Sequence, residues 1–395
     1  MRLPAFLFKD YTAVFIVYGI VVIIVCLQSL LLPLRQLELN GYWYTHYNNY
    51  IIFKQSFFHL LQHQDLYAWY LPEQWDLFKY SPAFALLFGV FAYLPDAVGL
   101  TLWNLLNAFC VFVAIRQLPT LDARAKISIL LFVLIEMTTS LQNAQSNAMM
   151  TGLLVMAFVR LEKGDYFLAA LFITLTAFIK IFGVFALILY VFYPGKVRLA
   201  AYTAICFVLM TILPLAVVSI DQLKFLYVSW LHMLIDDHSA SYGLSVMGWL
   251  TTWFHLGIDK NIVVGAGLLI IGLPFLRLKK YNDYYFRLLM LSAVLLWIVI
   301  FNHKAESPTF IIAMAGAGIW YFHKKRNTID LVLIILAFIF TSLSPTDLFP
   351  QWIQDNFFDP YAIKVVPCIL IWCKLMFEVL TEKFEVAPEV SISNS

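Results

Sequence analysis

Long apolar runs alternate with short polar segments along most of the chain. The first run extends from Tyr11 to Leu34, and others follow at 98–115, 127–141, 147–161, 166–179, 181–193, 199–219, 261–276, 286–301, 307–322, 329–344 and 361–381. A membrane-spanning helix needs about 20 mainly apolar residues. The pattern predicts an all-α polytopic membrane protein, a bundle of about 11–13 transmembrane or re-entrant helices.

Two stretches are expected to depart from simple crossings. Segment 82–95 begins and ends with proline, and at roughly 1.5 Å rise per residue it is too short for a full span. We therefore predict a re-entrant or incomplete crossing there. Runs 166–179 and 181–193 meet at Lys180, which is expected near the outer end of a helical hairpin.

Basic residues assign the loops to the two sides of the membrane. Five clusters lie between apolar runs, at 116–126, 160–163, 196–198, 277–280 and 324–326. By the positive-inside rule they face the cytoplasm together with Arg2 and Lys9, so both termini are expected to be cytoplasmic. The longer polar segments then share the extracytoplasmic side: a first outer loop at 35–80, a second at 220–260, and shorter turns at 142–147, 302–306 and 345–360. We expect one membrane domain over 1–383 and a disordered cytoplasmic tail over 384–395.

Composition supports a lipid-solvated protein. Of 395 residues, 62% are hydrophobic and only 13% are charged, with a formal net charge of +2. A soluble domain has about 25% charged residues, so a soluble enzyme and a disordered chain are excluded, and the small net charge gives no field for nucleic acid. The cysteines fall inside apolar runs and are interpreted as small buried hydrophobes rather than disulfides or metal ligands: Cys26, Cys110, Cys206, Cys368 and Cys373.

The first outer loop carries the most informative polar residues. Apolar positions within 50–61 have helical spacing, which favours an amphipathic helix along the outer membrane surface, with Asn48 or Asn49 as its N-cap. Asp65 follows in a polar stretch. The segment 75–82 then combines Asp76 and Lys79 with aromatic residues and leads directly into the membrane.

Four stretches together resemble glycosyltransferase family 87, a polytopic family with the GT-C fold. They lie at 49–67, 78–107, 144–147 and 178–182, in the order and spacing of the family. The chain is thus similar to polyprenyl-phosphate-mannose-dependent mannosyltransferases of bacterial envelopes. The resemblance implies an inverting transfer of a hexose, mannose above all, from a polyprenyl-phosphate donor to a lipid-linked or envelope glycan. It also implies a site on the extracytoplasmic face of the bacterial inner membrane, membrane lipids as surroundings, and no cofactor.

One departure from the family concerns the catalytic base. The family usually has an aspartate where this chain has Asn49, and that aspartate is taken to deprotonate the acceptor hydroxyl. An amide has no basic site near neutral pH. The catalytic candidates around the acceptor are therefore Asn49 itself with three possible replacement bases, Asp65, Asp76 and His303.

The substrate-binding candidates are mostly isolated cations and amides of the outer segments. A lysine between two apolar runs costs roughly 2.5–3.5 kcal/mol at a helix centre, so Lys180 is expected to contact the donor phosphate, with Lys304 and Lys79 beside it. The other candidates are Tyr80, Asn48, Gln145, Asn147, His238 and Ser245. Residues 236–239 have the side-chain types of a divalent metal site, but adjacent acids are more often solvated, so no metal ligand is assigned.

Simpler interpretations stand beside these functional ones. Asn48 and Asn49 fit a helix cap, Asp76 and Lys79 fit a surface ion pair, Lys180 fits snorkelling to the interface, and Glu136 fits a structural buried polar group. Two other functions also stay open. The Asn49 departure suits a non-catalytic binder of lipid-linked sugars, and the broken segments suit a lipid or solute transporter, although no internal repeat links them.

Overall fold

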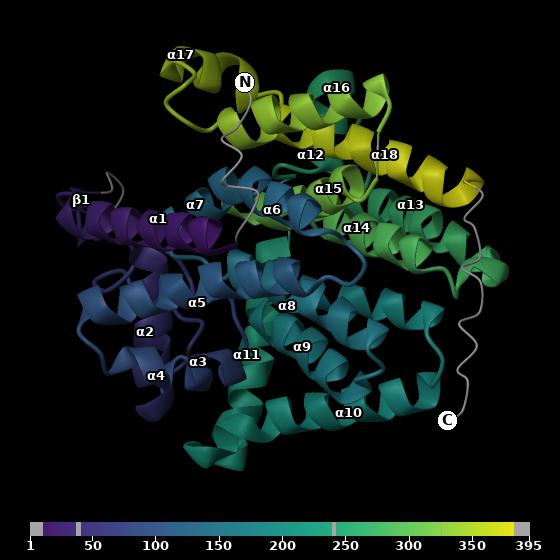
Figure 1. Ribbon diagram of the computed structural model, residues 1–395. Coiled ribbons are helices and arrows are strands. Elements are labelled where there is room, and N and C mark those ends of the chain that lie inside the picture. Colours follow the sequence, from purple (N-terminus) through teal and green to yellow (C-terminus); the bar gives the residue numbers. More distant parts are fainter. Residues whose placement is uncertain (1–10, 37–40, 239–241, 325, 383–395) are drawn as a thin grey trace.

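The chain folds almost entirely into helices, as the apolar runs predicted. The computed structural model describes residues 11–36, 41–238, 242–324 and 326–382 (Figure 1). Within these ranges one small sheet occurs, in which β1 (Arg35–Gln36) pairs antiparallel with β2 (Trp43–Tyr44). The all-α polytopic class is therefore confirmed.

Three helices in the described part of the chain are long and apolar enough to cross a membrane. They are α1 (Tyr11–Leu31), α5 (Asp96–Gln117) and α10 (Lys196–Ile212) continued by η3 (Leu213–Ala216). A fourth span is formed if α6 (Ala123–Phe132) and α7 (Leu134–Gln142), which are bent by 42° relative to each other, cross together.

Shorter elements make up the rest of the bundle. In chain order they are α2 (Asn48–Leu61), α3 (Pro82–Leu87), α4 (Gly89–Ala92), α8 (Asn147–Glu162), α9 (Tyr166–Ile179), η2 (Ile181–Phe192), α11 (Ile220–His238), α12 (Val246–Phe254), α13 (Lys260–Gly272), η4 (Leu273–Leu276), η5 (Leu278–Lys280), α14 (Tyr284–Ile300), η6 (Ser307–Thr309), α15 (Phe310–Phe322), α16 (Thr328–Ala337), η7 (Phe338–Leu343), α17 (Gln351–Ile353), η8 (Gln354–Phe358), η9 (Ile363–Val365) and α18 (Val366–Thr381). Many of the long helices run broadly across the view in Figure 1, whereas α11 stands at a steep angle to them.

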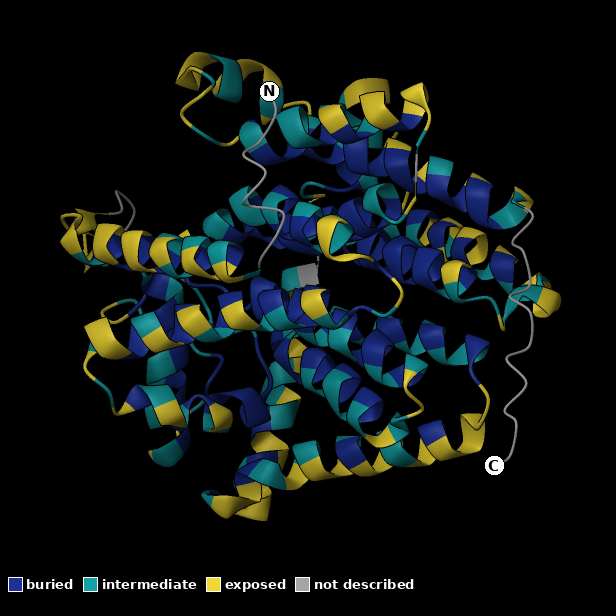
Figure 2. Ribbon diagram, viewed as in Figure 1, coloured by how far each residue is buried: buried dark blue, intermediate teal, exposed yellow. Residues whose placement is uncertain are grey.

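Burial separates the core of the bundle from its apolar outside. Almost every residue of α14 and α15 is buried, whereas only Leu199 and Cys206 are buried on α10 (Figure 2). Helix α1 likewise exposes isoleucines and leucines on one side. Exposed apolar helix faces of this length suit contact with acyl chains.

Two segments differ from simple expectations. The stretch 82–95 is split into α3 and α4, each too short to cross a membrane, which agrees with the predicted incomplete crossing. The stretch 220–260, expected as a long loop, is mostly α11 and α12. Apolar residues at helical spacing explain α11, because Leu223, Leu226 and Met233 are buried on it.

The first outer loop contains the expected helix, α2, but not the expected cap. Its N-cap is Tyr47, which makes no side-chain capping bond, so the prediction of Asn48 or Asn49 as N-cap is wrong. Helix α2 is also more deeply packed than a helix lying on a membrane surface. Phe53 is fully buried and makes edge contacts with Tyr80, Phe84, Phe88 and Trp103.

Four of the five predicted cytoplasmic clusters adjoin one another at one end of the bundle. The Tyr284 hydroxyl donates to the carbonyl of Pro119, close to the 116–126 cluster. Arg287 Nε lies 2.6 Å from Glu162 Oε1, close to the 160–163 cluster. Arg277 donates to the carbonyls of Val379 and Glu382, and Lys324 pairs with Glu382 at 2.6 Å. The expectation that these four clusters share one side therefore agrees with the contacts.

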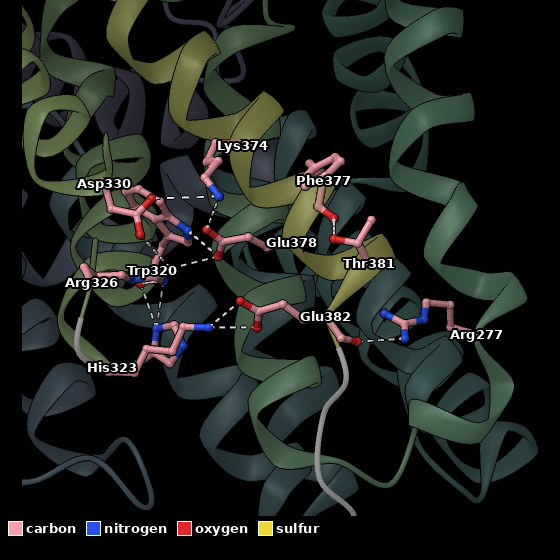
Figure 3. Close-up of polar contacts among 11 residues, drawn as sticks. Arg277, Trp320, His323, Arg326, Asp330, Lys374, Phe377, Glu378, Thr381 and Glu382 are labelled. Atoms are coloured by element: carbon pink, nitrogen blue, oxygen red, sulfur yellow. Dashed lines mark hydrogen bonds and ion pairs between the residues drawn. The ribbon is translucent and has the colours of Figure 1, made fainter. Parts of the chain in front are cut away.

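A buried ion network closes this end of the bundle (Figure 3). Arg326 lies 2.8 Å from Glu378 on α18 and 3.7 Å from Asp330 on α16, and Lys374 lies 3.1 Å from Glu378. The Trp320 indole donates to Glu378, and its carbonyl accepts from Arg326. These contacts join α15, α16 and α18. Each buried charge has an opposite partner, as burial requires.

Candidate active site

The opposite end of the bundle gathers the polar residues of the outer segments. The segment after α2 supplies Asp76 and Lys79, whose Nζ lies 3.2 Å from Asp76 Oδ2. Asp76 also accepts from the amide of Leu77 at 2.8 Å, which fixes its carboxylate at the start of this turn. Both side chains are between one third and two fifths exposed, so a ligand can reach them.

Helix α11 and the turn before η6 extend this pair. Asp237, near the end of α11, lies 3.9 Å from Lys79 and 3.1 Å from Lys304. The side chain of Asn302 accepts from the amide of Lys304 and holds the turn that carries it. One carboxylate thus sits between two ammonium groups that come from distant parts of the chain.

Lys180 reaches the same region from the turn between α9 and η2. Its Nζ donates to Asn147 Oδ1 at 2.9 Å and to Gln145 Oε1 at 3.4 Å. Gln145 in turn donates to Glu306 Oε2 at 2.9 Å, and Asn147 donates to Gln145 at 2.5 Å. The amides therefore form a bridge from Lys180 to Glu306, two residues beyond Lys304.

Backbone contacts lock these pieces together. The amide of Ser81 donates to the carbonyl of Phe178, which brings the start of α3 to the end of α9. The Ser146 hydroxyl donates to the hydroxyl of buried Tyr80 at 3.3 Å, and the Lys180 ammonium lies 5.8 Å from the centroid of the Tyr80 ring. Tyr80 thus separates Lys180 from the aromatic core around Phe53.

We call Asp76, Lys79, Lys180, Asp237, Lys304 and Glu306 the charge cluster. Burial alone would lower the pKa of Lys79, but the carboxylates of Asp76 and Asp237 outweigh it and raise that pKa above its usual value. Burial lowers the pKa of Lys180 to about 8, a shift that Glu306 opposes and Lys79 reinforces. Glu306 also contributes to the raised pKa of Lys79, so one carboxylate acts on lysines from both halves of the cluster.

Some expected site residues have other partners. The single Ser229 hydroxyl donates to the Asp65 carboxylate, with Oγ 2.8 and 2.9 Å from its two oxygens, and the amide of Tyr67 donates to the same carboxylate, so Asp65 fastens its loop to α11. The Asn49 amide donates to the carbonyl of Asn143 at 2.8 Å. Buried Asn48 accepts from the amide of Trp75. Among the described residues, no hydrogen bond or ion pair joins these three side chains to the charge cluster.

The remaining expected residues lie on the two segments that carry Asp237 and Lys304. Ser245 is fully buried and is the N-cap of α12, where it accepts from the amide of Gly248. His303 precedes Lys304 in its turn. His238 follows Asp237 at the end of α11, and its side chain lies outside the described part of the structure. The expected residues that meet in the charge cluster and its amide bridge are Asp76, Lys79, Lys180, Lys304, Gln145 and Asn147.

Two members of the cluster were missed as site residues. Asp237 belongs to a doublet that sequence alone suggested as a metal ligand or a solvated pair, and Glu306 belongs to a turn of which only His303 and Lys304 were assigned to the site. In the ranges that the structure describes, no group of three or more histidine, cysteine or acidic side chains is placed to hold a metal ion. Both acids could have been identified as candidates from the sequence, because each lies in a predicted outer segment with few other charged residues.

The arrangement suits the handling of a phosphate and a hydroxyl. Three ammonium groups lie within reach of one site, and phosphate oxygens pair well with such charges. Partly exposed carboxylates beside them are of the type that accepts a proton from an acceptor hydroxyl. The described residues thus provide cations for a leaving phosphate and an acid–base group in one location.

A comparison with known protein families gives one match. The family described as glycosyltransferase family 87 matches residues 78–345. This range contains Lys79, Lys180, Asp237, Lys304 and Glu306, whereas Asp76 and Asn49 lie before it. None of the curated proteins searched matches the chain.

Proposed function

Because the chain belongs to glycosyltransferase family 87 and is a membrane glycosyltransferase, we propose that it transfers a mannosyl residue from a polyprenyl-phosphate donor. The acceptor in this proposal is a lipid-linked or envelope glycan at the extracytoplasmic face of a bacterial inner membrane. The observation that supports it best is the convergence of Lys79, Lys180 and Lys304 on one partly exposed site. A lipid-linked phosphate that leaves the sugar needs such cations, because its negative charge grows as the glycosidic bond breaks.

The proposed reaction is a single displacement. The acceptor oxygen bonds to the anomeric carbon and gives its proton to a carboxylate, while the bond from that carbon to the phosphate oxygen breaks. The polyprenyl phosphate leaves with the bonding electron pair, and the lysines stabilise its charge. With one base and no covalent intermediate, the anomeric configuration inverts.

Asp76 is the proposed base. Of the three carboxylates in the charge cluster, Asp237 is shared by two lysines and Glu306 is engaged by the Gln145 amide. In the part of the chain that the structure describes, Asp76 has one cationic partner, Lys79, at 3.2 Å. When Lys79 turns to the donor phosphate, the Asp76 carboxylate is available for the acceptor hydroxyl.

The test compares two substitutions in the purified full-length protein reconstituted in nanodiscs. The substrates are polyprenyl-phosphate [3H]mannose and extracted envelope lipids as acceptors. Removal of a general base typically costs 10²- to 10⁴-fold, so Asp76→Asn is expected to lower kcat by at least about 100-fold. Asn49→Asp is expected to give no gain, because its side chain faces the carbonyl of Asn143.

Other outcomes would separate the competing functions. An Asn49→Asp variant that gains transfer would identify this chain as a non-catalytic relative whose base was lost. Wild-type protein that transfers no sugar from mannose, glucose or arabinose donors would contradict the proposed function.

A further inference from the structure

A cavity lies beside the charge cluster. It has a volume of about 360 Å³, and its lining includes Tyr242, Gly248, Thr252, Ala305, Asp359 and Ala362. Ala305 connects the two sites directly, because it stands between Lys304 and Glu306 of the charge cluster. Small-molecule sites range from about 300 to 1,000 Å³, so the volume suits a ligand of the size of one sugar ring.

The wall that the cavity shares with the cluster is held by close backbone packing. The amide of Leu244 donates to the carbonyl of Ala305 at 3.1 Å. Gly243 has φ +51°, and a Cβ there would clash with the carbonyl of His303. A Cβ on Gly248 would likewise clash with the carbonyl of Gly243. Only glycine fits these two positions, so the cavity and the Lys304 turn keep one fixed relation.

The polar groups of the cavity can recognise hydroxyls. The Asp359 side chain has no hydrogen bond or ion pair within the described residues, although it lines the cavity. Partial burial and the nearby Asp355 carboxylate raise its pKa. The Thr252 hydroxyl donates to the carbonyl of Gly248 at 2.9 Å and keeps a lone pair for a ligand O–H. Tyr242 adds an aromatic surface beside these groups.

We propose that this cavity binds a sugar ring of the acceptor, with Asp359 accepting a hydrogen bond from one of its hydroxyls. The inference rests on the proposed function, because it assumes that an acceptor approaches the charge cluster. It goes beyond that function in placing the acceptor between α12, the turn at 302–306 and the segment that follows η8. Asp359 acts here as an acceptor-binding residue that positions the ring and takes no proton.

A cysteine-protection experiment tests the cavity without relying on transfer. Thr251→Cys, in a Cys373→Ser background, places a thiol at the cavity lining, and a small methanethiosulfonate reagent reports its accessibility. Octyl α-mannoside, octyl β-glucoside and octyl β-galactoside serve as the sugar probes. We expect at least one of them to slow labelling several-fold. Adding Asp359→Asn should weaken that protection roughly 10-fold or more in probe concentration, the value of a hydrogen bond to a charged group.

Asp355→Asn provides a matched control. Asp355 lies four residues before Asp359 and is exposed as Asp359 is, but it accepts a hydrogen bond from Gln351 and does not line the cavity. This variant should leave protection unchanged. In transfer assays Asp359→Asn should raise the acceptor KM and leave the donor KM within about twofold, whereas a merely structural defect would lower kcat and change both.

The outcomes distinguish the two proposals. Labelling that no glycoside slows, in protein that transfers sugar, would overturn the acceptor cavity and leave the proposed function intact. Equal protection by octanol would also overturn it, because the alkyl chain would then be the ligand. Protection by a glycoside in protein that transfers nothing would support a carbohydrate site and contradict the proposed transferase activity.

Discussion

Replacing Lys180 by glutamine removes one positive charge from the charge cluster and should weaken donor binding. An ammonium group has three N–H donors, and two of those of Lys180 donate hydrogen bonds to Asn147 and Gln145. Within the described chain it has no ion-pair partner, so its third N–H and its charge are available to a phosphate. A charge-assisted hydrogen bond contributes about 1.5–3 kcal/mol, which corresponds to a roughly 10- to 150-fold rise in donor KM.

The pH dependence of the same group gives a second measurement. Because burial lowers the pKa of Lys180 to about 8, the ammonium is charged below that pH and is lost as the pH rises through it. The value of kcat/KM for the donor reports the free enzyme and should therefore fall above about pH 8. Lys180→Arg keeps its charge across this range, so its profile should lack that decline.

A matched control separates the phosphate contact from general damage. Lys54 on α2 is also partly buried, but it pairs with Asp96 at 2.6 Å, and no hydrogen bond or ion pair within the described ranges joins it to the charge cluster. Lys54→Gln should leave donor KM unchanged within about twofold. Equal losses in the two glutamine variants, or identical pH profiles for the wild type and Lys180→Arg, would refute the assignment of Lys180 to the donor phosphate.

Two further predictions concern stability and are read as apparent Tm in nanodiscs. Gly152→Ala on α8 should lower the free energy of unfolding by about 1–3 kcal/mol, because the added Cβ would lie 2.5 Å from the α5 backbone. The control Gly265→Ala on α13 adds a Cβ that meets nothing within 4 Å, so it should not lower Tm. Equal shifts in Tm for the two variants would contradict the tight contact between α5 and α8. Glu378→Gln should lower the free energy of unfolding by about 3–5 kcal/mol, because it removes a charged partner of the buried Arg326 side chain. The control Glu382→Gln, at a partly exposed side chain, should lower it by at most about 1 kcal/mol. An unchanged Tm for Glu378→Gln would show that the ion network contributes little to stability.

The helices were largely predictable because apolar length and flanking charge specify them. Run 166–179 coincides with α9, and run 98–115 lies within α5. The departures have tertiary causes. The break at Val133 between α6 and α7 has no proline or glycine to announce it, and η2 is a 3₁₀ helix whose Gly183 packs directly against Thr176. Apolar periodicity indicates that a segment is buried but does not give the bend or the hydrogen-bond register that packing selects.

The charge cluster was only partly predictable, for a different reason. Isolated lysines in apolar surroundings stood out individually, because each is costly there. Which acid meets which lysine depends on contacts between distant segments. Asp237 meets Lys79 and Lys304 from near the end of α11, a helix that stands at a steep angle to many of the others. Asp65 carried the same sequence signal as Asp76, yet Ser229 on α11 accounts for it. Residue type therefore identified the chemistry, and helix orientation decided which residues share it.

The position of Asn49 also explains how this chain can differ from its family there. Its amide donates to the carbonyl of Asn143, the residue that leads into the turn carrying Gln145 and Asn147. Those two side chains hold Lys180, so Asn49 supports the Lys180 half of the charge cluster through the backbone of that turn. A carboxylate at this position has no N–H to donate and would face a carbonyl oxygen, which costs the hydrogen bond and adds repulsion. An asparagine at position 49 is therefore suited to holding the turn, which agrees with the proposed reaction, in which the base for the acceptor comes from the charge cluster.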